Sequence, residues 1–218
     1  MKRISKETIL RIVILLVGLC IAHLGVTLFL LANLGADPFN VFVQGVFRSV
    51  SPLLNLSFLT HGNVHVVISL VIIIVLLIVD KTYIKIGTVL CMVFGGPIID
   101  FFTLVLSPLY QRNQSVLFNY LSLAAGCVIL AFGMTIVIKS DAGTGPNDLV
   151  AVVISDKLHK KFSIVRVAVD FSFVVIGFIL GGSFGPGTII CSFLVGPVAG
   201  FFLPKNEAVI NKILARLS

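Results

Sequence analysis

Side chains that could bind a ligand gather at two similar motifs in this chain. The first motif is Leu34-Gly35-Ala36-Asp37-Pro38-Phe39-Asn40, and the second is Ala142-Gly143-Thr144-Gly145-Pro146-Asn147-Asp148. In each, a proline that suits the first position of a helix follows a residue that can cap that helix, Asp37 or Gly145. A helix N-terminus presents unpaired N–H groups and a partial positive charge. Both motifs therefore indicate a site for an anionic group or a polarised carbonyl.

The candidate binding residues of the two motifs lie at these helix starts and in the first helical turn. They are Asp37, Pro38, Asn40, Gly145, Pro146, Asn147 and Asp148. The alternative interpretation is that they are ordinary turn and cap residues at the membrane surface. A capping Asp and a leading Pro need no ligand, and the duplication of the motif does not decide between the two interpretations.

Three further candidates are ionisable residues within apolar stretches, where an unpaired charge is costly. Arg166 and Asp170 are four residues apart, so they lie on one face of a helix and can pair. An internal ion pair without a binding role is the alternative for that pair. Asp100 has no local partner, which makes it a candidate for contact with a ligand or a proton. The alternative interpretation of Asp100 is that it lies near the outer lipid headgroups and has no binding role.

The remaining reactive residue types predict neither an enzyme nor a cofactor. The chain contains no nucleophile–base arrangement, no phosphate-binding glycine-rich loop and no metalloprotease motif. His61 and His65 have a spacing that could bind a metal, but no third ligand is evident, so we expect no metal site. Each of the four cysteines lies in an apolar run, and we interpret them as core residues: Cys20, Cys91, Cys127 and Cys191.

The composition indicates that these residues are positioned by helices in a lipid bilayer. Of the 218 residues, 58% are hydrophobic and 11% are charged, with a mean hydropathy of +1.14. A soluble domain carries about 25% charged residues, so this chain cannot form a water-facing surface of the usual kind. The net charge of +7 is interpreted as flanking charge that sets membrane orientation, rather than as affinity for nucleic acid.

The apolar runs predict an all-α, polytopic membrane helix bundle that forms a single membrane domain over residues 1–218. A spanning helix needs roughly 20 apolar residues. Six stretches are expected to span: 12–32, 62–79, 86–107, 117–138, 164–181 and 187–203. The motifs begin two shorter helices, 38–50 and 146–158, which at about 20 Å are too short to cross comfortably. Pro204 and Lys205 are expected to end the last span, leaving a short cytoplasmic C-terminal segment, 205–218.

Spaced glycines and prolines indicate two internal repeats of about 100 residues. Gly35 and Pro38 match Gly143 and Pro146 at an offset of 108, and Gly87 matches Gly187 at an offset of 100. We place repeat one at 11–108 and repeat two at 117–204. In transporters, repetition of this kind places the binding site at the interface between the repeats.

The basic residues allow two topologies, because Lys and Arg collect on the cytoplasmic side. With six spans the repeats are inverted and 14 of the 16 basic residues face the cytoplasm. With eight spans the repeats are parallel, 13 face inside, and Lys81, Lys85 and Lys139 lie outside. We favour six spans because of helix length. Both topologies place both termini in the cytoplasm.

At the same motifs the chain resembles the YczE/YyaS/YitT family of bacterial integral membrane proteins, with the YczE type as the most similar. The resemblance is carried by the first motif, by Gly96-Pro97-Ile98-Ile99-Asp100, by Gly143-Thr144-Gly145-Pro146-Asn147-Asp148 and by Gly196-Pro197. It implies a bacterial plasma-membrane protein and supplies no established catalytic residues. Phe39-Asn40 departs from the aromatic-Asp pair that is more usual in the family. Some relatives are grouped with exporters of small molecules.

These observations leave three hypotheses for function. The first is a small secondary transporter or exporter of an unidentified small solute, with its site between the repeats. The second is a membrane regulator or scaffold that binds a protein partner and transports nothing. The third is the substrate-binding subunit of a transporter made of several chains.

Overall fold

The computed structural model describes residues 6–35, 37–54, 61–113 and 115–216, with side chains placed for all of these except 51–54, 61–63 and 100. Every regular element in these ranges is helical, as predicted. The elements are α1 (Lys6–Ala32), α2 (Pro38–Leu54), α3 (His61–Asp80), the 3-10 turn η1 (Lys81–Tyr83), α4 (Ile86–Arg112), α5 (Val116–Lys139), α6 (Pro146–Leu158), α7 (Phe162–Ile179) and α8 (Pro186–Leu214).

Six of the described helices are long and apolar enough to cross a membrane, which confirms the predicted number of spans. They are α1, α3, α4, α5, α7 and α8. The two short helices lie where the motifs predict them. α6 has the expected 13 residues, whereas α2 has 17 and continues past residue 50.

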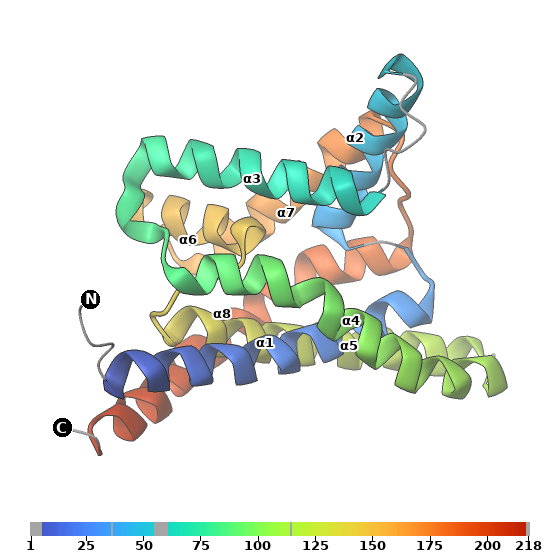
Figure 1. Cartoon of the computed structure of the whole chain (residues 1–218). Coiled ribbons are helices and arrows are strands. Elements are labelled where there is room, and N and C mark those ends of the chain that lie inside the picture. The colour runs from blue at the N-terminus through green and yellow to red at the C-terminus, as the bar shows by residue number, and fades with distance from the viewer. Residues whose placement is uncertain (1–5, 36, 55–60, 114, 217–218) are drawn as a thin grey trace.

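The start of α1 and the end of α8 lie at one end of the helix bundle, which we call the terminal end (Figure 1). Arg11, near the start of α1, lies 3.8 Å from the carboxylate of Asp141, and Lys85 pairs with the same carboxylate. The segments before α4 and after α5 are therefore at the terminal end too. This arrangement rules out the eight-span alternative, in which Lys85 lies on the side opposite to Arg11. It also makes α1 and α5 antiparallel.

The six-span topology predicts which side of the membrane each loop faces. In a chain whose own cysteines are replaced, Lys81→Cys and Lys157→Cys should react with a membrane-impermeant maleimide from the side that carries the termini. Arg112→Cys, at the far end of α4, should react only from the other side. The measurement compares right-side-out with inverted vesicles. Labelling of Lys81→Cys from the side opposite to a C-terminal tag would contradict six spans.

The core forms where α1, α5 and α8 pack together. Phe29, Leu123, Met134 and Val195 are almost fully buried there. Three of the cysteines are buried as expected, but Cys20 is exposed on α1, so the interpretation of all four as core residues is wrong at that position. The apolar composition of α1 concealed this, because a spanning helix is apolar on its lipid-facing side as well as on its packed side.

Each motif is held against the start of a span from the other half of the chain. The N–H of Gly187 donates to the carbonyl of Leu34, and the N–H of Gly87 donates to the carbonyl of Ala142, both at 2.8 Å. Gly35 and Gly143 have φ of 130° and 135°, a conformation that strongly favours glycine. The two connections pair the positions that the repeat matches, while the internal repeat itself stays a prediction.

Gly143→Ala is expected to destabilise the protein more than Gly181→Ala. Both positions have positive φ and impose backbone strain of about 1–3 kcal/mol on alanine. A Cβ at Gly143 would also lie 2.5 Å from the backbone nitrogen of Thr88, whereas at Gly181 it would meet no described atom within 4 Å. Thermal unfolding of the purified variants measures the difference. Equal loss in both would show that the contact between Gly143 and α4 adds nothing.

The last helix does not end at Pro204, as the sequence led us to expect, but continues to Leu214. Part of the segment 205–218 is therefore a direct extension of α8. Contacts with α5 hold this extension: Asn206 donates to the hydroxyl of Thr135 at 2.6 Å, and Lys139 pairs with Glu207 at 2.7 Å. These tertiary contacts offset the local preference of proline for ending a helix.

Candidate functional site

Three of the predicted site residues form a buried charged cluster between α6 and α7. Arg166 donates from Nε to Oδ2 of Asp170 at 2.9 Å and from Nη1 to Oδ1 of Asp148 at 2.5 Å. The side chains of Arg166 and Asp170 are 8% and 2% exposed, and that of Asp148 is 19% exposed. The predicted pairing of Arg166 with Asp170 is confirmed. The sequence did not indicate that Asp148 shares the same guanidinium.

The charged cluster carries one more negative charge than positive charge. One guanidinium faces two carboxylates. Oδ1 of Asp170 is buried and has no hydrogen-bond partner within the described ranges. A buried charge without a partner is costly, so this oxygen is the least satisfied atom of the cluster.

The first motif is closed on itself by a cap. Asp37 accepts hydrogen bonds from the backbone N–H of Asn40 at 3.2 Å and from its side-chain amide at 2.6 Å. The predicted capping role of Asp37 is confirmed. The partial positive charge at the start of α2, where we predicted an anionic ligand, is thus already met by a carboxylate of the chain.

The second motif carries its own carboxylate in the first turn of α6. Pro146 occupies the first position of the helix and Gly145 precedes it as the cap residue. The amide of Asn147 donates to Oδ1 of Asp148 at 3.0 Å. This carboxylate oxygen therefore accepts hydrogen bonds from both Asn147 and Arg166, which fixes its orientation toward α7.

Two of the other predicted residues, Pro38 and Asp100, are not part of the charged cluster. Pro38 is the first residue of α2, where its missing N–H costs no hydrogen bond. Asp100 belongs to α4, but its side chain is outside the described residues, so its role as a ligand stays a prediction.

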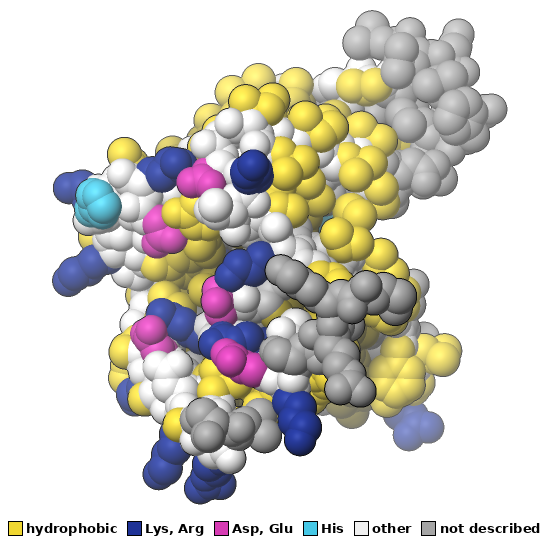
Figure 2. Space-filling view, turned by 60° about the vertical axis from the view of Figure 1, so that its left-hand side comes forward, with side chains coloured by type: hydrophobic (Ala, Val, Ile, Leu, Met, Phe, Trp, Pro, Cys, Tyr) yellow, Lys and Arg dark blue, Asp and Glu magenta, His cyan; other side chains and the backbone are white. Residues whose placement is uncertain are grey.

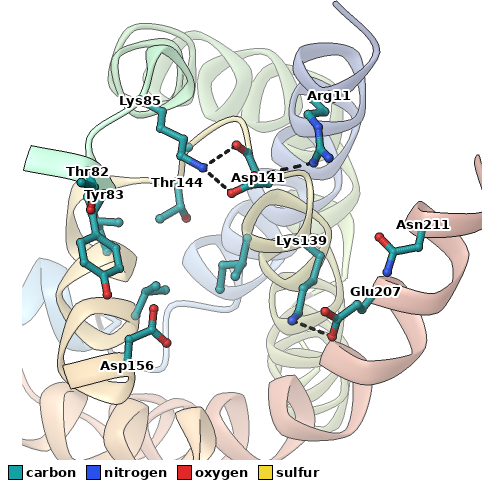
Figure 3. A pocket seen from close by; sticks show the side chains of 14 residues that line it. Arg11, Thr82, Tyr83, Lys85, Lys139, Asp141, Thr144, Asp156, Glu207 and Asn211 are labelled. Carbon is teal, nitrogen blue, oxygen red and sulfur yellow. Dashed lines mark hydrogen bonds and ion pairs between the residues drawn. The ribbon is translucent and has the colours of Figure 1, made fainter. Parts of the chain in front are cut away.

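A cleft of about 570 Å³ opens at the terminal end, and its wall includes Gly143 and Thr144 of the second motif (Figure 3). Ion pairs border it: Lys85 and Arg11 with Asp141, and Lys139 with Glu207. Figure 2 shows basic and acidic side chains gathered on this side of the molecule, beside an extensive hydrophobic surface.

Thr144 lies both in the cleft wall and in the second motif, and it was not among the binding residues predicted from the sequence. Its side chain is 3% exposed, and its hydroxyl has no hydrogen-bond partner among the described residues. The same is true of the buried hydroxyl of Thr88 in the first turn of α4, next to Gly143. The signal for both was present, since Thr144 lies inside the motif and Thr88 follows a glycine that matches Gly187.

Comparison with known proteins finds relatives along most of the chain. It is 28% identical over 213 residues to the uncharacterized membrane protein YczE of Bacillus subtilis, covering 97% of this chain and 94% of that protein. It is 25% identical to the uncharacterized protein YyaS of the same species, covering 88% and 91%. It is 28% identical to an uncharacterized protein of Haemophilus influenzae, covering 87% and 82%. No solved structure matches.

The resemblance to YczE and YyaS that the motifs predicted is therefore confirmed. Together with the six apolar helices, it shows a multi-pass membrane protein. The sequence model of one family matches residues 9–204, which include both motifs and most of every span. The chain belongs to that family, the family of unknown function DUF6198.

Proposed function

We propose that this protein is a small secondary transporter of the bacterial plasma membrane, with both termini in the cytoplasm, that exports a small solute. The observation that carries the proposal is the polar cleft at the terminal end, because two residues of its wall, Gly143 and Thr144, belong to the motif that also contributes Asp148 to the buried charged cluster. Ionisable groups inside a membrane bundle are costly to keep and commonly mark pathways for solutes or ions.

At the opposite end of the bundle, hydrogen bonds connect elements that a transporter would have to separate in order to open that end. The guanidinium of Arg48 donates to the carbonyl of Gly181 at 2.6 Å and to the hydroxyl of Ser183 at 3.0 Å. The N–H of Ser183 donates to the side chain of Gln44 at 3.0 Å. These bonds join α2 to the segment between α7 and α8. The cleft at the terminal end and the bonded contact at the other end support an alternating-access model in which the terminal end is the open one.

In this model, a change of the open side from one end of the bundle to the other would break specific contacts at each end. The ion pairs of Asp141 and of Glu207 connect elements at the terminal end, and the contacts of Arg48 connect elements at the opposite end. The charged cluster lies on α6 and α7, which reach both the cleft wall and the segment that Arg48 binds. A small rotation of these helices would therefore affect both ends, as in the rigid-body movements of repeat-built transporters.

Asp148→Asn is expected to lower solute flux at least about tenfold, because a charged contact between this carboxylate and a transported solute would be worth about 1.5–3 kcal/mol. The yield of folded protein should stay unchanged, because the amide oxygen of Asn can still accept the hydrogen bond from Arg166. Efflux of a panel of labelled small solutes from reconstituted vesicles measures the effect. Asp80→Asn, which alters an exposed pair with Lys157 at the end of α3, is the matched control. Flux that is the same in wild type and Asp148→Asn would show that the charged cluster is not part of the transport pathway. Absence of flux for every solute, with a stable protein partner recovered instead, would favour the scaffold hypothesis.

A further inference from the structure

The charge of the buried cluster indicates which class of ligand this site takes. Arg166 is bound by both Asp148 and Asp170, so the three side chains together carry a net negative charge within the bundle. A net charge in a low-dielectric interior is strongly unfavourable until a counter-charge reaches it.

The two helix starts do not favour an anion. Asp37 already accepts the hydrogen bonds at the start of α2, and Asp148 lies in the first turn of α6. An anionic ligand placed between them would meet carboxylates that have the same charge. A positively charged ligand would instead meet the oxygen atoms that these carboxylates present.

A separate observation points to the place of the missing partner. Oδ1 of Asp170 is fully buried and accepts no hydrogen bond from any described residue, although Oδ2 of the same carboxylate binds Arg166. Asp148 is bound to the same guanidinium and its side chain is 19% exposed, so it is the most accessible member of the cluster. Carboxylate oxygens are preferred ligands of hard cations and of ammonium groups.

We propose that the cluster formed by Asp148, Arg166 and Asp170 binds a small monovalent cation, which contacts Oδ1 of Asp170 and the carboxylate of Asp148. The cation is either an alkali metal ion or the ammonium group of an amine solute. Both supply the same single positive charge. The inference rests on the proposed transport function in that it names the ligand class of the same site, but its binding step can be measured without transport.

The experiment measures cation binding to the full-length protein in nanodiscs of zwitterionic lipid. The thermal unfolding midpoint is followed as NaCl, KCl or ethanolamine hydrochloride replaces N-methyl-D-glucamine chloride at constant ionic strength and pH. A cation present at a hundred times its dissociation constant should raise the midpoint by about 5 °C or more. Asp148→Asn should abolish the shift, and Asp80→Asn should retain it.

A shift with Na⁺ or K⁺ alone identifies a metal ion, and a shift with ethanolamine alone identifies an amine solute; either supports the proposal. No shift with any of these cations in folded wild-type protein overturns it. A midpoint that changes in a separate pH series but with none of these cations also overturns it, since the counter-charge is then a proton. An unchanged shift in Asp148→Asn overturns it as well. Where a variant is too unstable for melting, binding of radioactive ²²Na⁺ in a scintillation proximity assay at low temperature replaces the midpoint.

The two proposals fail in different ways. Flux of a solute in vesicles without any cation-dependent binding would remove this inference and leave the transporter. Cation binding that depends on Asp148, without flux of any solute, would leave the cation site and remove the transporter.

Discussion

Arg166→Gln is expected to be the most damaging single substitution in the described part of the chain. Removing the guanidinium leaves the buried carboxylate of Asp170 without its partner and takes away the charge that Asp148 binds. Breaking a buried ion pair from one side costs about 3–5 kcal/mol, which is a large share of the about 5–15 kcal/mol that holds a typical domain folded. The yield of monodisperse protein and its thermal unfolding midpoint should both fall sharply.

A double variant shows how much of the stability lost in Arg166→Gln is due to the unpaired charge of Asp170 and how much is due to lost packing. Arg166→Gln combined with Asp170→Asn removes both members of the buried pair, so the double variant should recover part of the stability that the single variant loses. Arg48→Gln is the matched control, because Arg48 binds Gly181 and Ser183 at a more exposed place and should cost much less. A single Arg166→Gln variant as stable as wild type would contradict the role of the charged cluster.

Gly133→Ala is expected to force α1 away from α5 and to lower the free energy of unfolding by about 1–3 kcal/mol or more. A Cβ at this position would lie 2.2 Å from the backbone nitrogen of Ala22 and 2.7 Å from the carbonyl of Gly18. Both are backbone atoms of α1, which cannot move aside as a flexible side chain can. Close approach of two helices through small residues is the main source of helix association in a membrane.

Gly96→Ala is the control for the packing of α1 on α5, because it adds the same methyl group at a helical glycine outside that contact. Gly96 lies within α4, and an added Cβ would meet no described atom within 4 Å. Alanine favours a helix over glycine by about 1 kcal/mol, whereas a Cβ directly before Pro97 crowds the ring of that proline, so the net change in stability should be small compared with that of Gly133→Ala. Thermal unfolding of both variants in the same detergent tests the pair. Equal losses would mean that the effect belongs to glycine in general and not to the contact between α1 and α5.

The sequence predicted the features that depend on local pattern. Run length identified the spans, the leading prolines located the starts of α2 and α6, and the spacing of four residues paired Arg166 with Asp170. Each of these follows from helix geometry within one segment. The end of α8 was misplaced for the same reason, because a local rule for proline ignores the contacts that α5 makes with Asn206 and Glu207.

The features that depend on how helices cross could not be predicted. Asp148 and Arg166 are far apart on any helical pattern, and they meet because α6 packs on α7. The cleft is lined by residues from several separate elements, among them Arg11, Lys85 and Glu207. In the sequence, these charges indicate only which side of the membrane the loops face. The ion pairs that they form depend on tertiary packing.

The two backbone bonds that join the halves of the chain also set an order of assembly. Leu34 is synthesised early, but the N–H that it accepts belongs to Gly187, at the start of the last span. During synthesis the carbonyl of Leu34 can therefore accept this hydrogen bond only after α8 has been made. The contact that holds the first motif is thus completed only by the last span to be synthesised.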